Sequence, residues 1–147
     1  MNNYVRLAAM IGTSMVVMYG MTYLNTYELA HVFFSESRLY MTIMMGASMT
    51  VIMLSFMLHM LENKKLNIMI VTGSILVFGV ALFTLRTQVL VDEVSYMRAM
   101  IPHHSIAILT SERAEITDPR VRDLADSIIE AQKREIEEMR LLIEDLK

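Results

Sequence analysis

Hydrophobic residues are concentrated in three long runs within the first 85 positions of the chain. The runs cover residues 7–24, 39–61 and 66–85, and none of them contains Asp, Glu, Lys or Arg. Each run is close to the roughly 20 apolar residues that an α-helix needs to cross the hydrocarbon core of a bilayer. Residues 1–86 are therefore predicted to be a membrane region with three transmembrane helices.

Residues 87–147 form a second region, in which charged side chains are frequent. Their pattern predicts one helix from about Thr87 to Glu115 and another that begins near Pro119 and runs to the C-terminus. The first of these could continue from the third span without a break. Asp118 suits the N-cap of the second helix, and Pro119 suits its first position. Because the turn between them is short, the helices are expected to form an antiparallel hairpin. The predicted fold class is all-α, with three transmembrane helices followed by a helical hairpin domain.

Composition supports this division and limits the chemistry. Hydrophobic residues make up 54% of the chain and its mean hydropathy is +0.43, which is more apolar than a soluble domain usually is. Residues 1–85 contain four basic and three acidic side chains, whereas residues 86–147 contain nine basic and thirteen acidic ones. This acidic balance argues against nucleic acid as a partner. The absence of cysteine excludes disulfides, thiolate zinc sites and iron–sulfur clusters.

The short loops indicate how the spans are oriented. Lys64 and Lys65 make the link between the second and third runs the most basic short loop. Positively charged loops usually stay in the cytoplasm, so the N-terminus is expected there and the hairpin on the opposite side. Arg86, directly after the third run, favours the reverse orientation more weakly.

The sixteen methionines have two possible roles. Methionine is a flexible gap-filler in apolar packing, and its thioether is also a soft metal ligand. The seven methionines of the second run are more consistent with packing and lipid contact than with a Cu(I) ladder. Gly46, Gly73 and Gly79 are expected to allow close helix approach. His31, after the first span, could be an auxiliary ligand but is better interpreted as a solvated surface histidine.

The second helix of the hairpin carries a heptad-like apolar seam that two polar residues interrupt. Its members are Val121, Ala125, Ile128, Gln132, Glu135, Met139, Leu142 and Leu146. A buried carboxylate without a partner costs several kcal/mol, so Glu135 needs a compensating group.

The first hairpin helix offers such groups at facing positions. Residues that face each other in an antiparallel pair have a nearly constant sum of residue numbers. With the turn near Thr117, His104 then faces Gln132, Met100 faces Glu135, and Met97 faces Met139. Pro102 predicts a local kink beside these residues, because proline removes one helical hydrogen bond.

Thioether and imidazole ligands together favour Cu(I), and by extension Ag(I), over hard cations. Glu135 could add an oxygen ligand or orient a histidine. Adjacent helical residues point about 100° apart, so one of the two neighbouring histidines could bind metal while the other faces solvent or a partner chain. The predicted metal ligands are Met97, Met100, His103, His104, Glu135 and Met139, with Gln132 and Asp92 in supporting positions.

Two segments of the tail resemble a known family. They are "DEVSYMRAMIPHH" at Asp92–His104 and "LADSIIEAQKREIEEM" at Leu124–Met139, and they are similar to the bacterial domain-of-unknown-function family numbered 305. The resemblance implies a ferritin-like helical bundle, and some members are implicated in periplasmic copper and silver binding or resistance. The matching positions are Met97, Met100, His103, His104, Gln132, Glu135 and Met139. The three spans depart from the secreted or lipid-anchored form of many members, and the aromatic residue often found after the last motif methionine is absent.

The expected function is that of a soft-metal binding protein, with copper as Cu(I), or alternatively silver, as its cofactor. It is expected to be a multi-pass protein of the bacterial inner membrane with a periplasmic hairpin, and not an enzyme, because no catalytic motif is present. Its expected partners are the bilayer, a second copy that completes a four-helix bundle, and a metal-exchange protein. The alternatives are a structural or sensory protein whose polar seam sets oligomer register without metal, and a redox or transport subunit that uses the methionine-lined spans.

Overall fold

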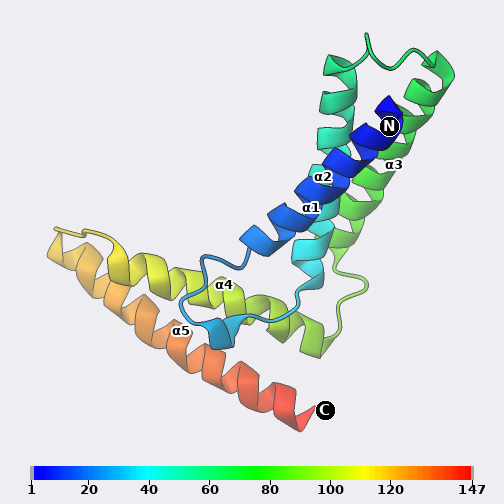
Figure 1. Ribbon diagram of the computed structural model, residues 1–147. Coiled ribbons are helices and arrows are strands. Elements are labelled where there is room, and N and C mark those ends of the chain that lie inside the picture. The colour runs from blue at the N-terminus through cyan, green and yellow to red at the C-terminus, as the bar shows by residue number, and fades with distance from the viewer. Residues whose placement is uncertain (1, 147) are drawn as a thin grey trace. The chain divides into compact units, whose positions relative to one another are not determined.

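A computed structural model describes residues 2–146, which form five α-helices, one short 3₁₀ helix and no strand (Figure 1). The elements are α1 (Asn3–Met21), η1 (Leu29–His31), α2 (Glu36–Phe56), α3 (Lys64–Thr87), α4 (Glu93–Arg113) and α5 (Pro119–Asp145). They divide into two compact units. The membrane unit contains the residues up to Thr22 and Ser37–Leu90, and the hairpin unit contains Tyr23–Glu36 and the residues from Val91 onward. The all-α prediction is confirmed.

The helices of the membrane unit suit a lipid environment. α1, α2 and α3 contain 19, 21 and 24 residues, and each is long and apolar enough to cross a membrane. They expose large apolar side chains, among them Val16, Ile52 and Phe83. Such a surface is stable in hydrocarbon, where a helix satisfies its own backbone hydrogen bonds. The chain is therefore a membrane protein.

Apolar side-chain packing and one close helix approach hold the three spans together. Leu7 of α1 and Leu54 of α2 are buried in one cluster, to which Ile70 and Val71 of α3 add partly buried side chains. A Cβ atom on Gly46 would collide with the Met15 side chain, so the predicted close approach at Gly46 is confirmed. At the other two candidates, Gly73 and Gly79, a Cβ atom would meet nothing within 4 Å, so that prediction is wrong there.

The chain breaks between α3 and α4 instead of continuing as one helix. Gln88 ends α3 in the left-handed conformation, with φ of 53°. Asp92 then caps α4, because its Oδ1 accepts a hydrogen bond of 2.7 Å from the backbone N–H of Ser95. These hydrogen bonds to Ser95 lower the pKa of the Asp92 carboxyl. The predicted continuity of the third span with the hairpin is therefore wrong.

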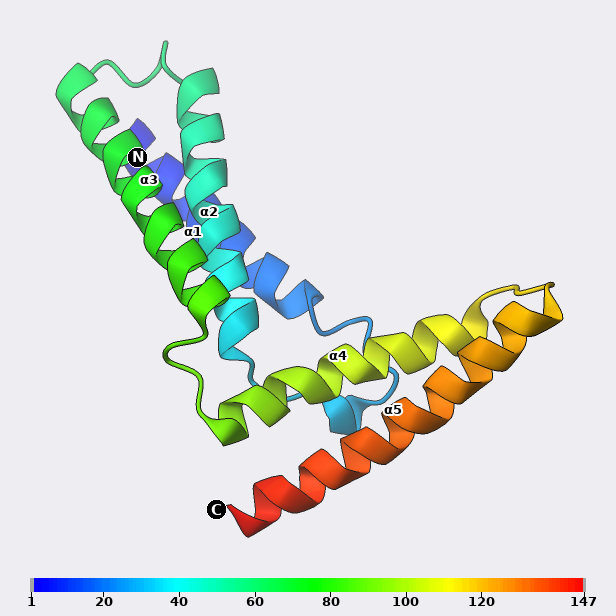
Figure 2. The same ribbon diagram turned by 180° about the vertical axis from the view of Figure 1, so that it is seen from behind.

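Helices α4 and α5 form the predicted antiparallel hairpin (Figure 2). The predicted start of α5 is confirmed, since Asp118 is its N-cap and Pro119 is its first residue. The core of the hairpin contains Met97, Ile101, Ile108, Ile136 and Ile143. Pro102 is buried inside α4, and the helix continues through it from Glu93 to Arg113.

The face that α5 buries differs from the predicted seam. Ala125 is buried as expected, but the other buried residues are Ile136 and Ile143. Val121 and Leu142, two predicted seam members, are 48% and 44% exposed. The prediction assumed that two helices share the core, whereas a third element also lies against it.

That third element is the segment Tyr23–Glu36, which joins α1 to α2 and includes η1. Its aromatic residues Tyr27 and Phe33 pack against the core of the hairpin. Lys133 of α5 also lies over Tyr27, with its Nζ atom 5.8 Å from the ring centroid. The segment therefore belongs to the hairpin unit, although the sequence places it between two membrane spans.

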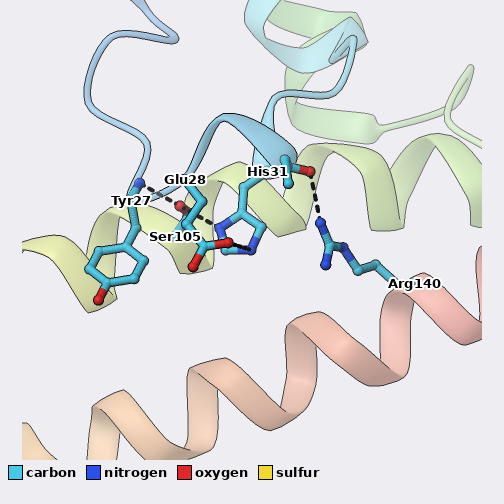
Figure 3. A network of polar contacts seen from close by, with 6 residues as sticks. Tyr27, Glu28, His31, Ser105 and Arg140 are labelled. Carbon is cyan, nitrogen blue, oxygen red and sulfur yellow. Dashed lines mark hydrogen bonds and ion pairs between the residues drawn. The ribbon is translucent and has the colours of Figure 1, made fainter.

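Polar contacts fix this segment on both hairpin helices (Figure 3). The backbone N–H of Tyr27 donates to Ser105 Oγ at 2.7 Å, and His31 Nδ1 lies 3.0 Å from the same oxygen. On the other helix, Arg140 donates to the backbone carbonyl of Ala30 at 2.9 Å. We call these three contacts the loop clasp.

His31 is a buried residue of the loop clasp. It is only 6% exposed, so the interpretation as a solvated surface histidine is wrong. Burial lowers the pKa of its imidazole, and the Glu28 carboxylate, 3.8 Å away, opposes this only in part. A neutral imidazole can accept the Ser105 hydroxyl hydrogen at Nδ1 while Ser105 Oγ accepts the N–H of Tyr27.

Acidification is expected to loosen the loop clasp. Because the pKa of folded His31 lies below the ordinary value of about 6.5, the open loop binds a proton at a higher pH than the closed loop does. The free energy of opening should thus be at its maximum above about pH 6.5 and fall as the pH decreases below it. Backbone hydrogen exchange of residues 23–36 in the full chain, corrected for intrinsic exchange rates, should accelerate over this range.

Two variants and one control sharpen the measurement. His31→Gln should remove the pH dependence, whereas His59→Gln, at an exposed histidine after α2, should leave it unchanged. Ser105→Ala should open the loop at every pH, because two hydrogen bonds of about 0.5–1.5 kcal/mol each are lost. Equal pH dependence in His31→Gln and the unmodified chain would refute the role of His31.

Candidate metal centre

The centre of the candidate site is the imidazole of His104 on α4. Its Nδ1 lies 2.9 Å from the backbone carbonyl oxygen of Met100, and its Nε2 lies 2.9 Å from Glu135 Oε2 on α5. A carbonyl oxygen only accepts hydrogen bonds, so Nδ1 carries a hydrogen in this contact. This fixes the tautomer and leaves Nε2 as the nitrogen that can bind either a proton or a metal ion. Metal-ligating histidines commonly have their second nitrogen held in this way.

Glu135 has a partner within the chain. Its side chain is 44% exposed, and that of His104 is 17% exposed. Glu135 Oε2 lies within hydrogen-bonding distance of His104 Nε2, so each side chain has a polar partner within the chain. His104 therefore supplies the compensation that Glu135 was expected to need, and burial of this carboxylate does not by itself require a metal.

The register of the hairpin differs from the predicted one. His104 contacts Glu135 instead of facing Gln132, which lies about one helical turn away along α5. Gln132 is half-buried at the edge of the hairpin. In this register α5 buries Ile136 and Ile143, and the segment Tyr23–Glu36 packs against the same core through Tyr27 and Phe33.

Three methionines of the hairpin belong to the predicted site. Met97 is 6% exposed in the hairpin core, and Met139 packs against the same core. Met100 is half-buried. Met100 precedes His104 by four residues and Met139 follows Glu135 by four, and residues four apart on a helix are neighbours. Met100 therefore lies one helical turn from His104 on α4, and Met139 lies one turn from Glu135 on α5.

The remaining predicted residues do not converge on this point. His103 is exposed, and its ring is 6.1 Å from that of His104 at an interplanar angle of 73°. This agrees with the expectation that one histidine points inward and its neighbour outward. Asp92 uses its carboxylate to cap α4.

The donor set indicates which metals the site suits. Among the residues that the structure describes, no three His, Asp or Glu side chains are arranged to hold a metal ion together. One imidazole with neighbouring thioethers suits a soft ion.

The sequence did not reveal the role of Ser105, which is completely buried beside His104. Its position four residues after Ile101 and three before Ile108 was the available signal, since it places the hydroxyl on the core face. Ser105, His31 and Glu28 are the residue types of a catalytic triad. However, Ser105 has no exposed surface and already accepts the N–H of Tyr27, so a substrate cannot reach it.

Comparison with known proteins places this hairpin in a family. The chain is 33% identical to an uncharacterized protein of Acanthamoeba polyphaga mimivirus over 110 residues, which cover 74% of this chain and 70% of that protein. This alignment is longer than residues 91–147 and so extends into the first 90 residues. No solved structure matches the chain. Residues 91–147 match the family model described as Domain of unknown function (DUF305), and the chain belongs to that family.

Proposed function

We propose that this membrane protein binds a soft metal ion, Cu(I) or alternatively Ag(I), through the hairpin, for metal homeostasis or delivery. The observation that carries the proposal is the geometry of His104. The Met100 carbonyl fixes its tautomer, and its Nε2 is directed toward Glu135, on a hairpin whose core includes Met97 and Met139. We infer binding and exchange with a partner protein, and not catalysis, as the role of the chain.

His104, Met100, Met97 and Met139 supply the nitrogen and sulfur donors that a soft ion prefers. An ion bound at Nε2 replaces the proton that Nε2 shares with Glu135. Glu135 then serves either as an oxygen ligand or as a nearby negative charge. Metal binding should consequently compete with protons at His104.

The proposal predicts that thioether and imidazole ligands contribute separately to Cu(I) affinity. Competition titration of the full chain in nanodiscs, with a chromogenic Cu(I) chelator, should show a loss of about tenfold or more in His104→Gln and in Met139→Leu. Leucine replaces methionine in a core at a cost usually below about 1.5 kcal/mol, so Met139→Leu should remain folded.

Met69→Leu is the matched control, because Met69 is 68% exposed on α3 and belongs to the membrane unit. It should bind Cu(I) like the unmodified chain. If the double variant His104→Gln/Met139→Leu also retained full affinity, the site would be refuted.

One observation favours a second candidate function. The His104–Glu135 pair satisfies both side chains without metal, so the polar seam could instead set the register of an oligomer. In that case, Cu(I) would not bind at the hairpin, whereas Glu135→Leu would change the oligomeric state.

The apolar surface of α5 supports self-association. Four of its large apolar side chains remain exposed, although they follow the 3-4 spacing of a helix-packing stripe. They are Val121 at 48%, Leu124 at 59%, Leu142 at 44% and Leu146 at 57%. A single hairpin leaves this stripe uncovered, and a second copy would complete a four-helix bundle.

Charge on this stripe should break the dimer. We expect Leu124→Glu and Leu142→Glu to convert a dimer to a monomer in detergent, as measured by light scattering coupled to size-exclusion chromatography. Thr110→Glu, at an exposed position of α4, should leave the dimer intact. A chain that is monomeric before substitution would contradict the proposal.

We also propose a bacterial inner-membrane location, with a cytoplasmic N-terminus and a periplasmic hairpin. The Lys64–Lys65 pair at the start of α3 supports it. A C-terminal reporter that is active only in the periplasm should be active, and activity of a reporter restricted to the cytoplasm would overturn the orientation.

A further inference from the structure

The segment Tyr23–Glu36 has two different faces. One face lies on the hairpin through Tyr27, Phe33 and the buried His31. The other face exposes large apolar side chains, of which Leu29 is 91% and Leu24 is 80% exposed, with Val32 at 42%. Because the loop clasp holds the first face, the segment cannot turn its leucines inward without breaking those contacts.

Chain connectivity keeps this apolar face near the membrane. Leu24 is the third residue after the end of α1 at Met21, and α2 begins at Glu36. Both helices are long and apolar enough to span a bilayer. In addition, the backbone N–H of Ser35 donates to the Tyr23 hydroxyl at 3.2 Å, which ties the two ends of the segment together. The segment is therefore closed at its base, where both spans leave the hydrocarbon core.

The side chains on this face are suited to lipid rather than water. Leucine and valine gain stability when they enter the apolar part of the interface. Glu28, the acidic neighbour of Leu29, is directed toward His31, with its carboxylate 3.8 Å from the imidazole. A second copy of the chain has a different exposed stripe available on α5, which is not tethered to the ends of two spans.

We propose that Leu24, Leu29 and Val32 insert into the interfacial layer of the bilayer, on the side where α1 ends and α2 begins. The partner of this surface is lipid. Since the opposite face of the segment is clasped by Ser105 and Arg140, the insertion provides the hairpin unit with a membrane anchor in addition to the covalent chain. The proposal does not depend on metal binding.

The chain contains no tryptophan, so one substitution provides a unique fluorescent probe. Leu29→Trp in the full chain would be reconstituted into phosphatidylcholine vesicles with bromine atoms either near the headgroup or deep in the acyl chains. The expected result is blue-shifted emission that shallow bromines quench several-fold more than they quench Leu141→Trp, a leucine of α5 that is 55% exposed and lies outside the α5 stripe. Leu76→Trp, 64% exposed on α3, serves as the lipid-facing positive control.

Two results would overturn the proposal. Water-like emission without bromine quenching would show that the face is solvated. Blue-shifted emission without quenching would show that protein covers it, as a second copy would. Leu24→Trp repeats the measurement at an independent position, so that a folding defect in one variant does not decide the outcome.

Discussion

The hairpin unit depends on one buried hydroxyl group. Ser105 lies on the core face of α4 with no exposed surface, where an unsatisfied polar group would be costly. It finds its partners outside the hairpin, in the Tyr27 backbone and the His31 ring. Through these contacts the segment Tyr23–Glu36, which joins two membrane spans, packs as a third layer on the two hairpin helices. The chain, which alternates between the two units in sequence, builds the hairpin unit from two separate pieces.

This third layer packs against the same core as the two helices that carry the candidate metal centre. Tyr27 and Phe33 cover the side of the hairpin core where Ile136 and Ile143 are buried. With these isoleucines inward, Glu135 lies at the edge of the seam, within 2.9 Å of His104 and partly accessible to water. An accessible imidazole–carboxylate pair can exchange its proton for another cation more easily than a fully buried pair can, because less desolvation opposes the change. The neighbouring thioethers then favour a soft ion over a hard one.

The two apolar surfaces that remain uncovered have different origins. The stripe on α5 is left over because a two-helix hairpin buries only part of the apolar surface of an amphipathic helix. The leucines of the Tyr23–Glu36 segment are exposed because its other face is already used against the hairpin. One surface lies on a helix of the charged tail and the other lies between two spans. Their surroundings therefore favour protein and lipid, respectively.

The sequence by itself determined the elements of this protein. Uncharged apolar runs specify three spans, and Asp118 with Pro119 specifies the start of α5, because both signals are local. It also identified His104 and Glu135 as candidate site residues, and these two are in contact. Only the tertiary structure decided which of them meet. Burying His31 depends on a contact between residues 74 positions apart, His31 and Ser105, whereas the pairing of Glu135 with His104 depends on the register between α4 and α5. Helical periodicity within the hairpin contains no information about a segment so distant in the chain. The register predicted from the two helices alone therefore differs from the observed one by about one helical turn.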